Sequence, residues 1–404
     1  MSDNSPAKGL SYYLPEPAKP HTALQIPGSH TIYVGPPACG RRHAMHAMQY
    51  GDSTKVSFLQ LSENDVALGK YERFISDAVF ELSEILPDSP RIFFITFFCV
   101  DSFLGTDEKA LLSSLHARFP DRQFAVNRVE PVLLSKTKAM GGKKHVNLYS
   151  FLKKTENHDA GVNFVGNFTS LDPDCEFLKL LKDLDAGPVR EIFRCETYEQ
   201  YQDMAKSSLT VTLNIIADGA AKYMEEALGI PRFYFPVSYS AAFIRDGYVK
   251  ISKMLGKEHS DFTGDYDSAV KYARETAKLL NGLPVAVDSS AFFMPFAAAR
   301  ALMEYGFNVS YILRSRHKFD ADASERDYIK ERCPQVTIII EDEYIDVKNT
   351  EPQKKCLAIG ADCARVLNAE FFADVWHDEG YFGFHGIRKL MTLIRAVFQP
   401  GGEA

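Results

Sequence analysis

Hydrophobic and polar positions follow two patterns along most of the chain. Short apolar runs predict buried strands, and segments with apolar residues three or four positions apart predict amphipathic helices. The clearest strand is Arg91–Phe98, a continuous apolar run typical of a parallel sheet covered on both faces. The clearest helix spans about residues 71–86. Because strands and helices alternate, the pattern predicts an α/β protein.

The alternation divides the chain into three blocks. The strands that it predicts are 31–34, 56–59, 91–98 and 123–126, then 162–166, 189–193, 209–216 and 232–235, and finally 284–287, 307–313, 335–340 and 357–360. We therefore predict three Rossmann-like, doubly wound parallel-sheet domains. Their predicted bounds are 29–155, 156–282 with connecting helices, and 283–404 with a C-terminal helix.

Two segments do not follow this alternation of strands and helices. Residues 1–28 are rich in proline and polar groups and are interpreted as an N-terminal arm. The basic, glycine-containing segment Lys136–Lys154 is interpreted as a solvated linker. Its Gly141-Gly142-Lys143-Lys144 run lacks the Walker pattern, and so does the rest of the sequence. We therefore predict no ATP site in this chain.

Composition narrows the class of protein. Hydrophobic residues make up 46% of the 404 positions and charged residues 25%, as in ordinary globular proteins. The net charge of −7 argues against non-specific nucleic-acid binding. Apolar runs stay well below the roughly 20 residues that span a bilayer, and the first residues do not resemble a signal peptide. The sequence predicts a cytoplasmic protein that binds neither membrane nor nucleic acid.

Seven cysteines are scattered without zinc-type or C-x-x-C spacing, so most are expected to be structural. Cys39 is expected between the strand 31–34 and a helix that begins at Gly40. A helix amino terminus lowers a thiol pKa and favours a thiolate that can attack a substrate or bind a metal. The alternative is a small buried apolar residue in a tight turn.

Cys99 occupies the equivalent place directly after strand 91–98. Ligands of open α/β sheets bind at the carboxyl edge of the strands. Cys39 and Cys99 are therefore predicted to face one site from two strand–helix loops. Two unrelated buried cysteines are the alternative interpretation.

Five motifs in order make the chain resemble the nitrogenase component 1 superfamily. The cysteine loop is similar to H-G-P-x-G-C, and the others to T-E-x-D-x-x-x-G, C-x-x-x-x-I-G-D-D, Y/H-M-E-E-K-Y-G-I-P and G-x-x-G-F-x-G. They are Gly35–Cys39 (GPPAC), Leu61–Gly69 (LSENDVALG), Cys99–Asp107 (CVDSFLGTD), Tyr223–Pro231 (YMEEALGIP) and Gly380–Gly386 (GYFGFHG). The resemblance spans about residues 30–398. It implies dimers of three-domain subunits, an interfacial iron–sulfur cluster, and electrons from an ATP-hydrolysing iron protein.

The resemblance assigns Cys39 and Cys99 as cluster ligands. Nitrogenase subunits carry a further cysteine ahead of the first loop, and residues 1–38 contain none. Two chains together would supply four thiolates, enough for one 4Fe–4S cluster that bridges them. In this cysteine pattern the chain resembles the homodimeric nickel-sirohydrochlorin a,c-diamide reductive cyclase. A homodimer and a related second subunit both remain open.

The substrate is expected between the domains. The strand 211–214 lacks the cysteine that a nitrogen-fixing cofactor needs, which favours an organic substrate such as a tetrapyrrole. Polar residues near predicted strand ends or turns are candidates for acids and for substrate binding, and each could instead be structural. The candidate acids are His317, His377, His385 and Asp288, with Tyr239 and Arg314 as substrate-binding candidates and Arg316 beside Arg314.

Three functions are compatible with these features. The first is the catalytic component of a nitrogenase-like reductase. The second is a non-catalytic scaffold or carrier that holds a metallocofactor or a tetrapyrrole on the same fold. The third is a three-domain protein that binds a small metabolite and holds no cluster. Substrate turnover with an iron protein separates the first from the second, and iron content separates both from the third.

Overall fold

Three parallel sheets organise the chain. The computed structural model describes residues 26–49, 53–69, 71–86, 88–101, 105–129, 140–167, 169–257, 261–314, 321–344, 347 and 354–398. The sheets have the strand orders β2-β1-β3-β4, β6-β5-β7-β8 and β11-β10-β9-β12-β13. All of their strand pairs are parallel. The predicted α/β fold with doubly wound sheets is confirmed.

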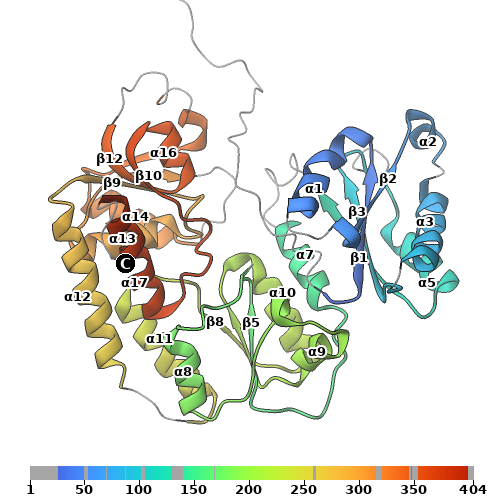
Figure 1. Cartoon of the computed structure of the whole chain (residues 1–404), viewed down its shortest axis with the longest axis horizontal. Helices are drawn as coiled ribbons and strands as arrows, with labels where there is room; N and C mark the ends of the chain where they lie inside the picture. The colour runs from blue at the N-terminus through green and yellow to red at the C-terminus, as the bar shows by residue number, and fades with distance from the viewer. Residues whose placement is uncertain are drawn as a thin grey trace, which may run out of the picture.

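The first sheet is built from the first part of the chain. Its strands are β1 Ser29–Gly35, β2 Val56–Gln60, β3 Ile92–Phe98 and β4 Gln123–Val129. Its helices are α1 Pro37–Gln49, α2 Glu63–Ala67, α3 Tyr71–Ile85 and α5 Glu108–Arg118. Figure 1 shows α1 on one face of the sheet and α3 and α5 on the other. Strands β1 and β3 are fully buried, as a parallel sheet covered on both faces requires.

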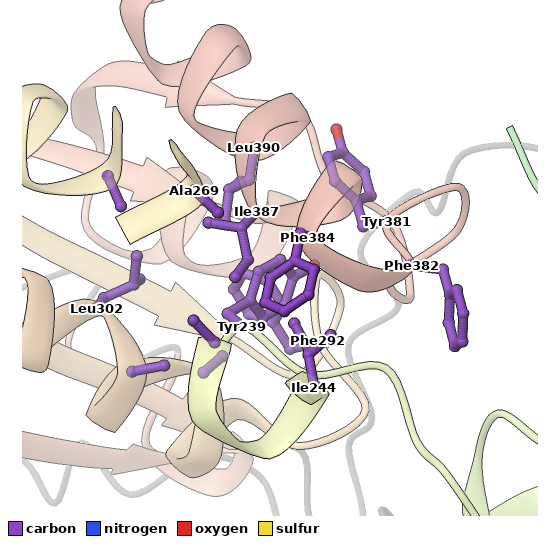
Figure 2. Close-up of a cluster of buried hydrophobic side chains, with 14 of the residues drawn as sticks. Tyr239, Ile244, Ala269, Phe292, Leu302, Tyr381, Phe382, Phe384, Ile387 and Leu390 are labelled. Carbon is purple, nitrogen blue, oxygen red and sulfur yellow. The ribbon is translucent and has the colours of Figure 1, made fainter. Parts of the chain in front are cut away.

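The second and third sheets share one hydrophobic core. The second group contains β5 Val162–Val165, α8 Glu176–Asp183, β6 Val189–Glu191, α9 Tyr198–Asp203, β7 Leu209–Thr212, α10 Asp218–Tyr223, a π-helical turn Met224–Leu228, β8 Arg232–Tyr234, α11 Ala241–Met254 and α12 Thr263–Leu279. The third contains β9 Pro284–Asp288, α13 Pro295–Tyr305, β10 Asn308–Arg314, α14 Ala323–Arg332, β11 Thr337–Ile340, β12 Lys354–Ile359, α16 Ala361–Val366, β13 Ala369–Ala373 and α17 Gly383–Phe398. Figure 2 shows Tyr239, Phe292 and Phe384 within this core.

The interpretation of Lys136–Lys154 as a solvated linker is wrong for its described part. Residues Met140–Tyr149 form helix α7, which packs against α10. Leu148 and Tyr149 are buried in a cluster that contains residues from the first and second sheets. Gly141 and Gly142 disfavour a helix in isolation, so tertiary burial decides this element. The predicted domain bounds stay a prediction.

The strand order of each sheet reverses at one place, the switch point. Strands β1 and β3 meet there in the first sheet, β5 and β7 in the second, and β9 and β12 in the third. Open α/β sheets bind ligands at the carboxyl ends of the strands at this point. No described helix is long and apolar enough to cross a lipid bilayer.

His30 makes the stability of the first sheet depend on pH. Its Nε2 atom lies 2.8 Å from Ser57 Oγ, and burial lowers the pKa of His30 from its usual 6.5 to about 4. Between these values the unfolded chain binds a proton at this position that the folded chain does not. We therefore expect the His30 contribution to the free energy of unfolding to be present above pH 6.5 and lost as the pH falls towards 4.

Urea denaturation at several pH values between 7 and 4 tests this expectation. The variant His30→Gln should lose less stability over this interval than the wild-type chain, whatever its absolute stability. His116→Gln is the control, because His116 is exposed on α5. An H30Q chain with the wild-type pH slope would contradict the assignment.

Candidate functional site

The first switch point carries the two cysteines predicted to act together. Cys99 directly follows β3 and is exposed, and Cys39 is half-buried in the first turn of α1. The helix begins at Pro37 rather than at Gly40, so Cys39 lies inside it. Val34 on β1 is in register with Phe97 on β3. The structure therefore places both thiols at the same edge of two paired strands.

The electrostatics of Cys39 differ from the sequence expectation. Burial, and then the charge of Cys99, raise the pKa of the Cys39 thiol. The helix amino terminus alone would have lowered it. Removal of water and repulsion between two nearby thiolates both disfavour the charged form of Cys39. A bound cation would reverse this balance, because it stabilises both thiolates at once.

Aromatic side chains pack against one another near the strand ends that the two cysteines follow. The Tyr33 ring stacks between Phe58 and Phe98, with centroids 5.3 Å and 5.6 Å away. His43, one helical turn after Cys39, stacks on Tyr33 at 4.6 Å. Gly40 permits this packing, because a Cβ atom there would lie 2.7 Å from Phe58 Cδ1. Tyr33 and Phe98 are buried in this packing, next to the strand ends that lead to the cysteines.

A buried ion pair anchors the segment after Cys99. The Asp101 side chain is 2% exposed and accepts a hydrogen bond from Arg128 Nε at 2.8 Å and another from Thr106. Arg128 also pairs with Glu108, which in turn pairs with Lys143 of α7. Sequence analysis did not identify this network. The available signal was two polar residues, Asp101 and Thr106, between a fully apolar strand and the next helix.

A pocket occupies the second switch point. It is lined by the loops that follow β5, β7, β8 and β9 and by the segment between β13 and α17, and its cavity volume is about 20 Å³, room for roughly one water molecule. His377 and His385 line it, together with Asp172, Asp378 and Glu379. Of the residues predicted for substrate chemistry, the structure therefore brings these two histidines together in one pocket.

The two histidines are held by different means. His377 and Asp378 both have left-handed backbone conformations, with φ of 47° and 60°. Their backbone N–H groups donate to the carbonyl oxygens of Ser290 and Ala291, which follow β9 in the third sheet. The His377 ring stacks on Phe293 at 5.0 Å. Such conformations are costly in non-glycine residues and often mark functional sites.

His385 lies in the first turn of α17. Its Nε2 atom is 3.2 Å from Asp172 Oδ2, and its backbone N–H donates to Glu176. The pKa of Asp172 is lowered first by the backbone N–H of Asp174 and then by His385 and Lys389. Gly383 is required at the start of this helix, because a Cβ atom would collide with the Tyr248 hydroxyl and Glu176.

The remaining predicted residues lie elsewhere. Tyr239 is buried, and its hydroxyl donates to Asp378 Oδ1 at 3.1 Å. It therefore holds in place a residue that lines the pocket. Arg314 ends β10 and is not among the lining residues. His317 and Arg316 lie outside the described residues.

Asp288 is the last residue of β9 and lies at the third switch point. Its buried carboxylate accepts hydrogen bonds from the backbone N–H groups of Ser290, Ala291 and Cys363 and from the Ser290 hydroxyl, at 2.6–2.9 Å. Its acceptor capacity is used within the fold. Asp288 therefore ties the end of β9 to the start of α16, and we do not retain it among the candidate acids.

The residues present can hold half of an iron–sulfur cluster. Two thiols meet at one edge, and the described residues contain no group of three or more His, Cys, Asp or Glu arranged to bind a metal. A cubane cluster takes four thiolates. The donor set of one chain therefore fits a cluster shared with a second chain, with Cys39 and Cys99 as the candidate ligands.

Three doubly wound sheets with a thiol pair at the first switch point define the class of protein. A family model described as nitrogenase component 1 type oxidoreductase matches residues 18–399. The chain belongs to this family. No match was found among curated proteins.

Two solved structures share the fold. "Nitrogenase Cp1 at pH 6.5" matches with a TM-score of 0.71 and 17% identity, over 98% of this chain and 96% of that chain. "Nitrogenase Cp1 at pH 5" matches with a TM-score of 0.59 and 13% identity, over 95% and 89%. At these identities the likeness shows the three-sheet fold and leaves the activity to be argued from this chain's residues.

Proposed function

We propose that this chain is the catalytic component of a nitrogenase-like reductase. In this proposal Cys39 and Cys99 hold one half of a 4Fe–4S cluster, and a second chain holds the other half. An ATP-hydrolysing iron protein supplies low-potential electrons. The observation that carries the proposal is the thiol pair at the first switch point of a chain of this family. When bound, the cluster would supply one-electron transfer.

The chain's own residues prepare the cluster site. The buried rings of Tyr33 and Phe98 lie near the strand ends that lead to the cysteines, and apolar surroundings are one determinant of cluster potential. The Asp101–Arg128 pair fixes the segment that leaves Cys99. Exposure of Cys99 leaves the outer side of the site open to a second chain.

We propose that the substrate, an organic molecule with a tetrapyrrole as the candidate class, binds next to the pocket at the second switch point, because the pocket itself has room for roughly one water molecule. Reduction by electrons requires protons as well, and an imidazole can hold and transfer a proton near neutral pH. We propose His377 and His385 as the proton donors. Asp172 Oδ2 lies 3.2 Å from His385 Nε2.

A turnover experiment tests the proposal. Anaerobically reconstituted protein is mixed with a cognate iron protein, ATP and a candidate tetrapyrrole, and substrate reduction is followed by absorbance. We expect reduction only with all components present. Iron-loaded protein that binds the tetrapyrrole without reducing it would instead support the scaffold or carrier function.

A further inference from the structure

A surface groove runs between α12 and α17, two helices that pack side by side (Figure 1). Its cavity volume is about 480 Å³, which suits a small organic molecule. None of its described lining residues lines the pocket at the second switch point. We call it the α12–α17 groove, and its lining residues are Ser268, Lys271, Tyr272 and Glu275 of α12 and Arg388 and Thr392 of α17.

The α12–α17 groove carries more positive than negative charge. Lys271 is exposed and makes no hydrogen bond or ion pair with any residue that the structure describes. Glu275 is the one carboxylate among the described lining residues, and Arg395 Nη2 lies 3.7 Å from its Oε2 atom. Arg395 is itself fixed, because its guanidinium lies 4.1 Å over the Tyr272 ring and its Nε donates to Thr276 Oγ1. The groove therefore attracts anions.

Both helices present donors to the groove. The lining residues of α12 recur three or four positions apart and those of α17 four positions apart, so each set lies on one helix face. The hydroxyl oxygens of Tyr272 and Thr392 lie 3.3 Å apart, one from each helix. Each helix also gives one cation, Lys271 from α12 and Arg388 from α17. Two separate cations suit a ligand with two anionic groups.

Arg388 also belongs to the contacts that hold the start of α17. Its guanidinium lies 3.4 Å from Glu176 Oε2 and 3.7 Å from Asp265 Oδ1. Both distances exceed the roughly 2.8 Å of a strong charge-assisted hydrogen bond, so a ligand can compete for this side chain. Glu176 accepts hydrogen bonds from the backbone N–H groups of Phe384 and His385, at 2.7 and 2.8 Å. One carboxylate therefore contacts both Arg388 and the backbone that carries His385.

We propose that the α12–α17 groove binds a small organic molecule with at least two anionic groups, carboxylates or phosphates. Lys271 pairs with one anionic group and the Arg388 guanidinium with another. The hydroxyl groups of Tyr272 and Thr392 donate to the remaining oxygen atoms. This site goes beyond the proposed function and does not depend on it.

Occupancy of the groove reaches the pocket at the second switch point through Arg388. A ligand that draws the guanidinium toward the groove weakens its contact with Glu176, the residue that holds the His385 backbone. Because His385 lines the pocket, the ligand acts there as an effector. The coupling is reciprocal, as for any two linked binding sites.

Isothermal titration calorimetry of the anaerobically purified full-length chain tests the site. The probes are tricarballylate for carboxylates and fructose 1,6-bisphosphate for phosphates, at constant ionic strength. We expect one of them to bind once per chain with a dissociation constant of about 1 mM or lower. Acetate, with its single charge, should bind at least about 10-fold more weakly. Absence of binding by both probes up to about 20 mM overturns the proposal.

Lys271→Gln identifies the groove as the place of binding. It should raise the dissociation constant at least about 10-fold, because it removes one of the two cations. Lys278→Gln is the matched control, since Lys278 is exposed on the same helix and is not a lining residue. Both variants should keep the thermal unfolding midpoint within about 2 °C, as exposed substitutions do. Equal affinities of wild-type and K271Q protein overturn the proposal.

Histidine NMR tests the link to the pocket. Chains labelled with ¹³C-histidine are saturated with the tighter probe, and the His385 signal is assigned from its loss in His385→Gln. We expect this signal to move in the wild-type and K278Q chains and to stay in place in K271Q at the same probe concentration. A bound probe that leaves the His385 signal unmoved overturns the effector role. Neither measurement uses turnover or iron content, so failure here is distinct from failure of the proposed function.

Discussion

Cys39→Ala and Cys99→Ala proteins are expected to be nearly free of iron after anaerobic purification. The wild-type chain should hold about four iron atoms per pair of chains. Each substitution removes two of the four thiolates from a twofold dimer, because it is present in both copies. A cluster left with two ligands should dissociate, and its EPR signal should disappear. Iron and sulfide analysis together with EPR measure the loss.

Cys333→Ala is the control for these variants. Cys333 is partly buried at the end of α14 and packs against the core shared by the second and third sheets. Its substitution should leave the iron content unchanged. Far-UV circular dichroism should show that all three variants are folded. A Cys39→Ala or Cys99→Ala protein with a full iron–sulfur spectrum would refute the ligand assignment.

Arg128→Gln is expected to be the most destabilising single change near the site. It leaves the Asp101 carboxylate buried and without its charged partner. Removing one partner of a buried ion pair typically costs about 3–5 kcal/mol, and the partly exposed Arg128 favours the lower end, about 3 kcal/mol. The midpoint of urea denaturation should fall accordingly. Iron retention should fall as well, because the segment that carries Cys99 loses its anchor.

The double variant Asp101→Asn/Arg128→Gln sharpens this prediction. Removing the unpaired charge should recover part of the lost stability, and the coupling between the two changes measures their interaction. Arg73→Gln is the matched control, because the Arg73–Asp77 pair is exposed and such pairs contribute little. Equal destabilisation by Arg73→Gln and Arg128→Gln would contradict the special role of the Asp101–Arg128 pair.

The sequence was sufficient for the thiol pair and for every described strand except the edge strand β13, Ala369–Ala373, which it missed; strands β6 and β7 end earlier than predicted, at Glu191 and Thr212. Arg91–Phe98 is apolar at nearly every position, and such a run forms a buried parallel strand whatever its neighbours are. Because Cys39 and Cys99 each follow such a strand, their meeting at one edge follows from the sheet alone. At these positions the local sequence pattern and the tertiary structure lead to the same buried strands and the same place for the two cysteines.

Other residues could not be placed from the sequence. Asp288 and His377 both lie near strand ends, where catalytic and structural side chains have the same sequence signature. Only the hydrogen-bond partners distinguish them: Asp288 is saturated by four donors, whereas His377 lines a pocket. Helix α7 was missed because its two glycines oppose helix formation locally and its packing on α10 favours it.

The sequence by itself determined the class of fold through its periodicity and the meeting of Cys39 and Cys99 through the positions where strands end, and the resemblance of five motifs indicated the family and the two candidate ligands. Only the tertiary structure decided which polar groups share a pocket. It also decided which thiol is exposed. Those properties depend on contacts between residues far apart in the chain, such as His385 with Asp172 and Arg128 with Asp101.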